Sequence, residues 1–260
     1  MSSYSDFAAV YDTLMRDVDY KKRAEYIVKL FKKYGKTPTL LLDLACGTGA
    51  FSSRFSEMGI ETIGVDMSEE MLSVARENAY DNGDTTLYLC QKAEELDLFG
   101  TIDGAVCLMD SVNHLTDKRT LEKAFKRVSL FMEKDGLFIF DVNTVYKHKC
   151  VLGNNTTVFE QDGVFCAWQN EYVEKTDTVN IRLDFFAENG EGYDRYTEEF
   201  AERAYTVEYL TKLLKKCDFE VLCVFDDMTE KPPKDNSERI FFVAKKIHQT
   251  NAVAVIQKKK

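Results

Sequence analysis

LLLDLACGTGAF, residues 40–51, is the most informative stretch of this sequence. The apolar run from Leu40 to Leu44 predicts a β-strand, the glycines Gly47 and Gly49 predict a tight turn, and the residues that follow predict a helix. In this arrangement the backbone amides and the positive end of the helix dipole face whatever lies against the turn. The two glycines let a ligand approach the backbone closely, as in folds that bind dinucleotides.

Two polar residues near this turn argue against a nicotinamide dinucleotide. Asp43 lies at the end of the predicted strand, and its carboxylate would repel a pyrophosphate. Ser52 stands where the dinucleotide motif G-x-G-x-x-G has its third glycine. A carboxylate here suits a ligand that carries a sulfonium and an ammonium group. An NAD-dependent dehydrogenase is therefore the weaker interpretation.

A second acidic residue follows the next predicted strand. Asp66, in the sequence Gly64-Val-Asp-Met-Ser68, comes 19 residues after Gly47. An acidic side chain at this position accepts hydrogen bonds from both ribose hydroxyls of a nucleotide ligand. The alternative is that Asp66 is a turn or capping residue, although Ser68 is the better candidate for a helix cap.

Short apolar runs alternate with amphipathic helical stretches over residues 39–143, which is typical of βαβ units in a mostly parallel sheet. Strands are predicted at residues 40–44, 62–65, 87–90, 102–108 and 137–142. Helices are predicted from Ser68 to Asn82-Gly83 and over residues 121–132. A helix capped by Thr206 and two strands that can pair antiparallel, 219–225 and 240–244, complete the pattern. The predicted fold class is α/β, with a Rossmann-like seven-stranded, mostly parallel sheet and helices on both faces.

Residues 150–203 follow a period of two instead. Val179, Ile181, Leu183 and Phe185 alternate with polar residues, and turn signals occur at Asp162-Gly163 and Asn189-Gly190. This pattern predicts an antiparallel β insertion. The Rossmann-like domain would then consist of residues 1–149 and 204–247, and residues 248–260 would form a flexible tail.

The composition of the 260-residue chain is that of an ordinary globular protein, with 45% hydrophobic and 30% charged residues. No apolar run approaches the roughly 18 residues of a membrane span, and the first residues form no basic leader, so we expect a cytoplasmic protein without a membrane partner. The seven cysteines form no C-x-x-C pair and the three histidines form no zinc motif. We therefore expect reduced cysteines in the core and no metal site.

The charge distribution bears on nucleic-acid partners. A net charge of −10 opposes attraction to RNA or DNA. Residues 21–36 are an exception, because seven basic residues there are accompanied by Glu25 alone. A solvated helix face is the favoured interpretation of this segment and an RNA-binding face is the alternative.

Four segments together resemble the successive motifs of class I methyltransferases: DLACGTG (43–49), VDMSEEM (65–71), CLMDSVNH (107–114) and GLFIFD (136–141). The likeness extends from Tyr4 to about Lys246 and is strongest to a bacterial subgroup with a β insertion before the last helix. That subgroup is similar to sugar and other small-molecule N-methyltransferases. The resemblance implies S-adenosylmethionine as the cofactor and a small molecule as the acceptor of the methyl group; it favours no oligomeric state.

The resemblance also implies which residues bind the cofactor. Asp43, Ala45 and Gly47 would surround its methionyl group, and Asp66 and Met67 would hold the ribose and adenine. The remaining candidates are Tyr11 in an amino-terminal cover, together with Cys46, Gly49, Met71, Gln91, Lys92, Ala93, Met109 and Asp110.

Two positions depart from the usual motifs. Ala45 stands where glycine is common, which the backbone tolerates if φ is negative there. Lys92 stands where the subgroup has an acidic residue near the adenine amine. A backbone carbonyl is then expected to recognise that amine.

The acceptor side is less specified by the sequence. Asp110, His114 and Tyr11 are candidates for a general base, which is needed only if the acceptor enters protonated. Acceptor-binding candidates are Asn113, His114, Asn143, Trp168 and Arg203. Their ordinary alternatives are a loop histidine, a core tryptophan and a salt-bridge arginine. We expect the β insertion to cover the acceptor site.

Two alternatives keep the fold but change the function. An RNA methyltransferase would use the basic residues 21–36 and bind RNA in a salt-sensitive way. A non-catalytic module would present the β insertion to a protein partner without any methyl transfer.

Overall fold

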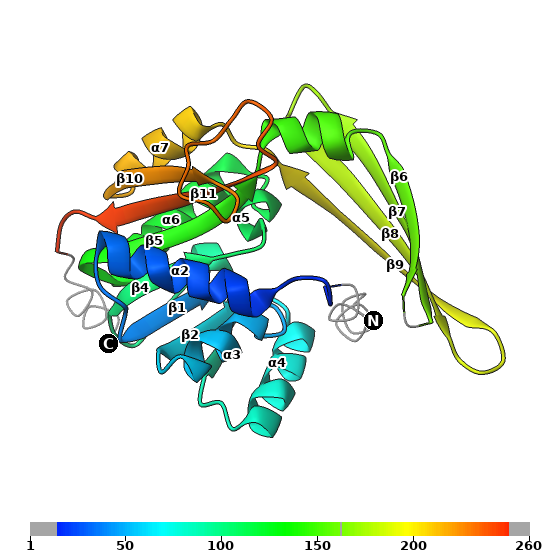
Figure 1. Ribbon diagram of the computed structural model, residues 1–260, viewed down its shortest axis with the longest axis horizontal. Coiled ribbons are helices and arrows are strands. Elements are labelled where there is room, and N and C mark those ends of the chain that lie inside the picture. Colours follow the sequence, from blue (N-terminus) through cyan, green and yellow to red (C-terminus); the bar gives the residue numbers. More distant parts are fainter. Residues whose placement is uncertain (1–14, 162, 250–260) are drawn as a thin grey trace.

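A seven-stranded sheet forms the centre of the computed structural model, which describes residues 15–161 and 163–249 (Figure 1). Its strands are β1 (Leu40–Leu44), β2 (Glu61–Asp66), β3 (Leu87–Cys90), β4 (Ile102–Cys107), β5 (Met132–Asn143), β10 (Phe219–Asp226) and β11 (Arg239–Lys246). They lie in the order β10-β11-β5-β4-β1-β2-β3. The pairs from β3 to β5 are parallel, whereas β11 runs antiparallel to both β5 and β10. The predicted Rossmann-like α/β sheet is confirmed.

Helices cover both faces of this sheet. α2 (Tyr20–Tyr34) and α3 (Ala50–Glu57) pack on one face, where Figure 1 shows α2 crossing in front of the strands. α6 (Lys118–Phe131) and α7 (Val207–Lys216) pack on the other face. The period of two in the strands supplies both cores: Leu41 and Ile139 point to α2, while Leu42 and Phe140 point to α6 and α7.

Local signals fixed several helix ends as predicted. α4 (Glu69–Asn82) begins at Ser68, whose hydroxyl accepts from the amide of Met71 at 3.1 Å, and ends at Gly83 in the left-handed region. Thr206 caps α7 in the same way through the amide of Tyr209. One boundary was wrong: Met132 was predicted to end α6 but begins β5. It stays buried, because the apolar stripe of the helix leads directly into the buried strand.

The predicted β insertion is a four-stranded antiparallel sheet of β6 (Thr156–Gln161), β7 (Val164–Val173), β8 (Thr178–Glu188) and β9 (Tyr193–Arg203). A π-helical turn, η2 (Lys147–Leu152), precedes it, so the strands begin later than residue 150. Val179, Ile181, Leu183 and Phe185 form one buried face of β8, as their alternation predicted. Figure 1 shows this sheet extending away from the main sheet like a wing.

Two further expectations concern the ends and the membrane. In the region expected to be a flexible tail, His248 forms an ion pair with Asp218, and residues 250–260 lie outside the described part of the chain. None of the helices over residues 15–161 and 163–249 combines the length and the apolar character needed to cross a bilayer.

Candidate active site

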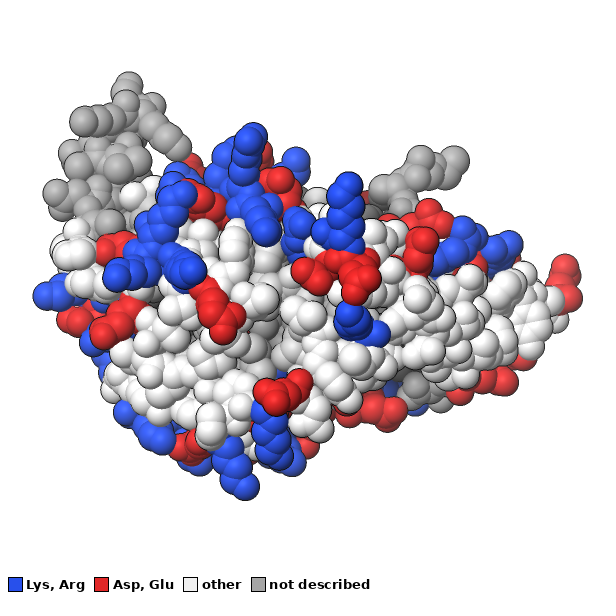
Figure 2. Space-filling view, turned by 90° about the horizontal axis from the view of Figure 1, so that it is seen from above, with Lys and Arg blue, Asp and Glu red and all other residues white. Residues whose placement is uncertain are grey.

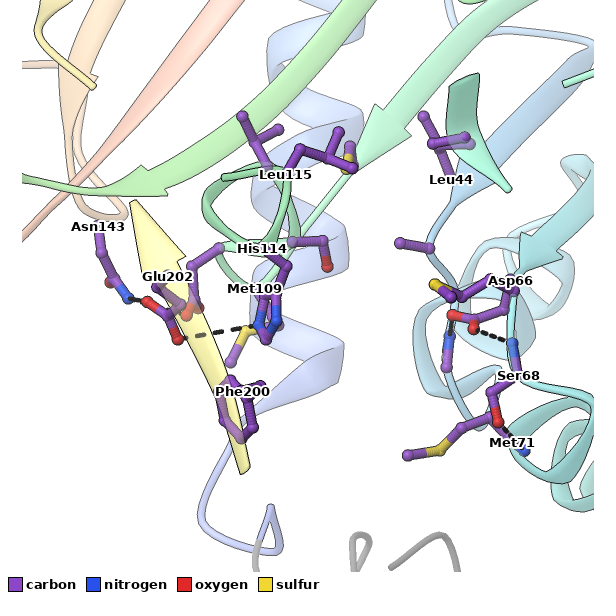
Figure 3. Close-up of a pocket in the computed structure, with 18 of the residues that line it drawn as sticks. Leu44, Asp66, Ser68, Met71, Met109, His114, Leu115, Asn143, Phe200 and Glu202 are labelled. Carbon is purple, nitrogen blue, oxygen red and sulfur yellow. Dashed lines mark hydrogen bonds and ion pairs between the residues drawn. The ribbon is translucent and has the colours of Figure 1, made fainter. Parts of the chain in front are cut away.

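A cavity of about 430 Å³ lies at the carboxyl ends of β1, β2 and β4 and continues to the inner face of the wing-like sheet. Ligands of open α/β sheets bind at this edge. Figure 3 shows two sides of the cavity facing each other, one with Asp66 and Met71, the other with His114, Phe200 and Glu202. The first side comes from β2 and α4, the second from α5 (Ser111–His114) and β9.

Most residues predicted for the site line this cavity: Ala45, Gly47, Asp66, Met67, Met71, Gln91, Ala93, Met109, Asp110, His114, Asn143 and Trp168. Other predicted residues do not line it: Asp43, Cys46, Gly49, Lys92, Asn113 and Arg203. Tyr11 lies outside the described residues.

The turn after β1 has the conformation that its glycines allow. Gly47 and Gly49 have φ of 56° and 76°, in the left-handed region. A Cβ atom at Gly49 would come within 2.3 Å of the Tyr88 hydroxyl, so this glycine is needed for packing. A Cβ atom at Gly47 would meet nothing within 4 Å. Gly47 therefore presents bare backbone to the cavity, as a ligand cradle requires.

The expectation for Ala45 was wrong. Its φ is 59°, not negative, so it shares the left-handed conformation that favours glycine. The residue is exposed, and it lines the cavity. The turn around Gly47 imposes this conformation on a residue with a Cβ atom, and some strain is stored next to the cavity.

Asp66 has the structural role that the sequence analysis left open, and it also lines the cavity. Its Oδ2 accepts from the amide of Gly47 at 2.9 Å, and its Oδ1 accepts from the amide of Ser68 at 2.9 Å. The side chain thereby ties the turn after β1 to the end of β2. An ionised carboxylate has about four lone-pair sites. Each oxygen of Asp66 keeps acceptor capacity toward the cavity that it lines.

Asp43 lies behind the turn and not in the cavity wall. The carboxylate is buried and accepts from the hydroxyl of Ser52 at 2.6 Å. Burial raises the pKa of Asp43 to about 7, with Ser52 opposing the shift and the nearby Asp66 adding to it. Ser52, which replaces the third glycine of the dinucleotide motif, is thus a partner of this carboxyl group.

The segment after β3 presents an acidic residue to the cavity, although Lys92 stands where the subgroup has its acidic residue. Lys92 is exposed and does not line the cavity, whereas Glu94 does. Gln91 fixes the loop, since its amide group donates to the carbonyl of Asp97 at 3.1 Å and accepts from the amide of Asp97 at 2.8 Å. A carboxylate therefore faces the cavity from this loop despite the lysine.

The turn after β4 is held by buried charges. Met109 and Asp110 are both left-handed, with φ of 55° and 53°, and their amides donate to Asp141 at 2.8 and 3.0 Å. Arg239 lies 2.6 Å from Asp110 and also pairs with Asp141. Burial raises the pKa of Asp110, but the positive charges of Arg239, His114 and Lys147 together hold that pKa below its usual value. Because Asn143 donates to the other oxygen of Asp110 at 2.8 Å, this carboxylate is a poor proton acceptor.

Asn113 and Arg203, predicted to bind the acceptor, instead connect the two sheets. Asn113 is fully buried; its Nδ2 donates to the carbonyls of Asn143 and Arg203 at 3.1 and 2.8 Å. The guanidinium of Arg203 donates to the carbonyls of Thr176 and Thr116. Both side chains donate to backbone carbonyls, and neither of them lines the cavity.

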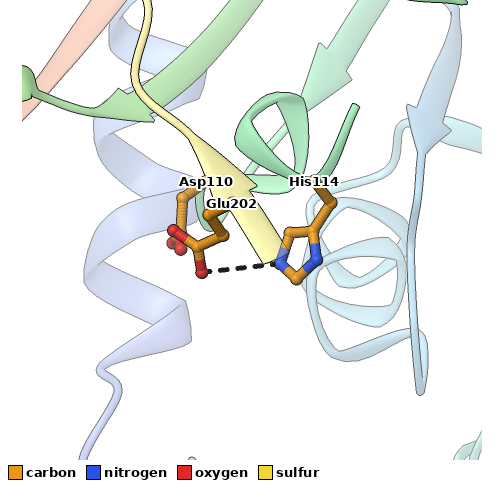
Figure 4. Close-up of side chains that lie close together, drawn as sticks. All are labelled: Asp110, His114 and Glu202. Atoms are coloured by element: carbon orange, nitrogen blue, oxygen red, sulfur yellow. Dashed lines mark ion pairs between the residues drawn. The ribbon is translucent and has the colours of Figure 1, made fainter. Parts of the chain in front are cut away.

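Glu202 and His114 form the other side of the cavity. Glu202 is buried at the end of β9, and its Oε2 accepts from Asn143 Nδ2 and contacts His148 Nε2, both at 3.1 Å. Its Oε1 lies 3.8 Å from Nε2 of His114 (Figures 3 and 4). The His114 ring stacks on Phe200, with centroids 5.1 Å apart. His114 is therefore placed by a carboxylate and an aromatic ring.

Sequence reasoning missed the residues that β9 contributes, namely Glu198, Phe200 and Glu202, all of which line the cavity. A signal existed, because these residues are two apart and so share one face of a strand. The sequence did not show which face turns toward the cavity.

Ion pairs occupy much of the basic segment 21–36. Lys29 and Lys33 pair with Glu230, Arg23 pairs with Asp227, and Lys36 pairs with Asp103. Figure 2 shows basic and acidic side chains intermixed on one face of the molecule, with no broad patch of a single sign. These pairs support the interpretation of the segment as a solvated helix face.

Comparison with known proteins agrees with this geometry. A family model described as a methyltransferase domain matches residues 41–136. The chain is 35% identical over 244 residues to the putative methyltransferase YqeM of Bacillus subtilis strain 168, covering 94% of this chain and 97% of that protein. An S-adenosylmethionine-dependent methyltransferase from Clostridium acetobutylicum ATCC 824 is 36% identical, with a TM-score of 0.86 and coverage of 95% and 100%. The chain belongs to the S-adenosylmethionine-dependent methyltransferases.

The cofactor of this methyltransferase is S-adenosylmethionine, as the sequence predicted. CalS10, an amino pentose methyltransferase from Micromonospora echinaspora with the cofactor bound, has the same fold, with a TM-score of 0.74, 16% identity and coverage of 92% and 96%. The residues present fit a cationic nucleoside: Gly47 offers open backbone, and Asp66 and Glu94 line the same side of the cavity. These findings exclude the alternative that the chain is an NAD-dependent dehydrogenase.

Proposed function

We propose that this methyltransferase transfers a methyl group to a small molecule held between the strand ends of the main sheet and the inner face of β7–β9. One observation carries the proposal: a single cavity is lined by the turn after β1 and by the wing-like sheet. CalS10, which has this fold, is described as an amino pentose methyltransferase, and an amino pentose is a small molecule. The wing-like sheet would cover the acceptor and not the cofactor.

Four residues would hold the cofactor in this proposal. Asp66 would accept from the ribose hydroxyls with the lone pairs that its backbone bonds leave, and Glu94 would take the adenine amine in place of Lys92. Gly47 would let the methionyl group approach, and the charge of Asp43 would act on it from behind the turn. When bound, S-adenosylmethionine supplies an electrophilic methyl carbon whose leaving group needs no acid.

The protein's main task is then alignment, which contributes up to roughly 7 to 11 kcal/mol in well-oriented reactions. Trp168 and Phe200 would hold the acceptor from the wing-like sheet, with His114 beside them. The indole of Trp168 is fixed by a hydrogen bond of 2.7 Å to Asn170, which makes it a rigid wall.

Calorimetric titration with S-adenosylmethionine, S-adenosylhomocysteine and NAD is the first test, and the first two are expected to bind. Trp168→Ala and Phe200→Ala should then keep cofactor affinity and lose release of S-adenosylhomocysteine over a panel of small amines, alcohols, thiols and acids. Phe165→Ala is the matched control, because Phe165 packs on Phe186 on the opposite face of the same sheet. Full turnover in both cavity variants would contradict the proposed acceptor site.

A further inference from the structure

Two buried carboxylates face the cavity from β9. Glu198 and Glu202 are each about 4% exposed, and both line the cavity. Buried carboxylates are uncommon unless they meet a cation or hydrogen-bond donors. Neither residue belongs to the cofactor side, which is formed by the ends of β1 and β2.

The two oxygens of Glu202 differ in their surroundings. Asn143 and His148 hold Oε2 at 3.1 Å each. A carboxylate oxygen accepts, so Nε2 of His148 carries the hydrogen. Oε1 is 3.8 Å from His114, beyond hydrogen-bond length, and so it keeps acceptor capacity. Glu202 is thereby fixed in position with one oxygen available on the cavity side.

The charge of the cavity wall is negative. Its described carboxylates are Asp66, Glu94, Asp110, Glu198 and Glu202, against the cations Lys147 and Arg239. Arg239 is matched by Asp110 and by Asp141 behind it. A phosphate or carboxylate group would meet like charge on this wall, whereas an ammonium group would meet opposite charge.

Aromatic rings complete an environment suited to a cation. Trp168, Phe159 and Phe200 line the acceptor half of the cavity next to the two glutamates. An ammonium or alkylammonium group gains from aromatic faces as well as from carboxylates. Alcohols and anions are attracted less strongly than an ammonium group by aromatic faces and carboxylates.

A metal ion is the competing occupant, because ligand atoms of Asp110, His114 and Glu202 lie within 4.8 Å of one another (Figure 4). The contacts of Asp110 argue against it. One oxygen of Asp110 pairs with Arg239 and the other accepts from Asn143. A metal ion here would have to displace a buried guanidinium or lie beside it.

We infer that Glu202, assisted by Glu198, binds the ammonium group of an amine acceptor and takes up its proton before methyl transfer. The inference rests on the proposed function and narrows it to amines that carry no phosphate. Ammonium N–H would donate to Oε1 of Glu202, on the side of the cavity opposite Asp66.

The reaction balances without any further reagent. One N–H bond of the ammonium breaks and the proton goes to Glu202, which leaves a lone pair on nitrogen. That pair forms the new N–C bond as the C–S bond breaks, and its electrons stay on sulfur. His114, whose side chain is 46% exposed, lies between Glu202 and solvent and passes the proton outward.

The sole tryptophan of the chain makes the acceptor half observable, because Trp168 lines it. We would titrate cyclohexylamine, cyclohexanol and cyclohexanecarboxylate into protein saturated with S-adenosylhomocysteine and follow the fluorescence of Trp168. The amine is expected to bind at least about tenfold more tightly than the alcohol. An alcohol or carboxylate that binds as tightly as the amine, or no response to any probe, would overturn the inference.

Two variants locate the effect. Glu202→Gln should reduce the preference for the amine to within about threefold, while Glu199→Gln, on the opposite face of β9, should keep it. If Glu202→Gln does not fold, Glu198→Gln takes its place, and the wild-type preference still decides the acceptor class. A preference that survives in both cavity variants, or that needs added Mn²⁺ and disappears with EDTA, would overturn the assignment.

The outcome of these titrations can be told apart from a failure of the proposed function. They report occupancy of the acceptor half and need no turnover, and they are repeated without S-adenosylhomocysteine. Failure of cofactor binding in the calorimeter contradicts the proposed function, whereas failure of amine preference contradicts only the inference.

Discussion

At the scale of single residues, the structural role of Asp66 and its proposed role in cofactor binding can be measured separately on one variant. Asp66→Ala removes two hydrogen bonds to backbone amides, so the cofactor-free protein should lose about 1 to 3 kcal/mol of unfolding free energy. S-adenosylmethionine should also bind at least about tenfold more weakly. Glu77→Ala, on the exposed surface of α4, is the control for both measurements. Unchanged affinity would leave Asp66 with a structural role only.

Asp43 predicts a pH dependence of cofactor binding. The pKa of Asp43 is raised to about 7 in the folded protein. The protonated group therefore contributes to the free energy of unfolding at low pH, and this contribution is lost as pH rises from about 4 through 7. A cationic ligand favours the ionised carboxylate. Affinity for S-adenosylmethionine should therefore rise with pH across about 6 to 8 and binding should release a proton, which calorimetry in two buffers detects. Asp43→Asn should abolish both effects; proton release that persists in this variant would point to another group.

Ala45 provides a test of local strain. A left-handed residue with a Cβ atom is disfavoured by about 1 to 2 kcal/mol, and glycine costs about 0.4 to 1 kcal/mol through the unfolded chain. Ala45→Gly is therefore expected to stabilise the protein by about 0.5 kcal/mol in denaturant unfolding. Ala79→Gly, inside α4, should destabilise it. A loss of stability in Ala45→Gly would mean that its methyl group makes contacts that outweigh the strain.

At the scale of elements, β11 contributes the cation that neutralises the turn after β4. Arg239→Met would leave Asp110 and Asp141 buried without their counter-ion, and we expect a loss of about 3 to 5 kcal/mol. The pKa values of both carboxyl groups would then rise, because burial is no longer opposed. The variant should regain stability as pH falls, whereas the wild type loses the contribution of Asp110.

Chemical denaturation at about pH 8 and about pH 5 measures this difference. Lys245→Met is the matched control on the same strand. Lys245 forms a longer ion pair of 3.6 Å with Glu220, and both side chains of this pair are partly exposed. Such pairs contribute about 0 to 1 kcal/mol. Equal losses in the two variants would show that Arg239 acts through packing and not through charge.

Sequence periodicity was informative for elements and weak for their partners. The alternation in β8 and the caps Ser68 and Thr206 gave correct elements because these signals are local. Asn113 and Arg203 were predicted to bind the acceptor, and the structure shows them bonded to backbone across the two sheets. Such long-range contacts leave no periodic trace in the sequence.

At the scale of the whole molecule, the cofactor side was more predictable than the acceptor side. The motif around Gly47 and Asp66 lies on consecutive strand ends, where the parallel sheet itself fixes relative position. Glu202 reaches the cavity only because the wing-like sheet turns one face toward it, and nothing near Glu202 in the sequence specifies that orientation. The motifs thus describe one side of the cavity, while the wing-like sheet supplies Glu198, Phe200 and Glu202 on the other side.

The pairing of Arg239 with Asp110 spans 129 residues, and it has a consequence for biosynthesis. While the ribosome is still translating the region before β11, the nascent methyltransferase already contains the turn after β1, β2 and all of the wing-like sheet. It still lacks the guanidinium that holds Asp110 and Asp141. Contacts of such long separation form late and slowly. The emerging chain should therefore complete the turn after β1 and the wing-like sheet before Arg239 can neutralise Asp110 and Asp141.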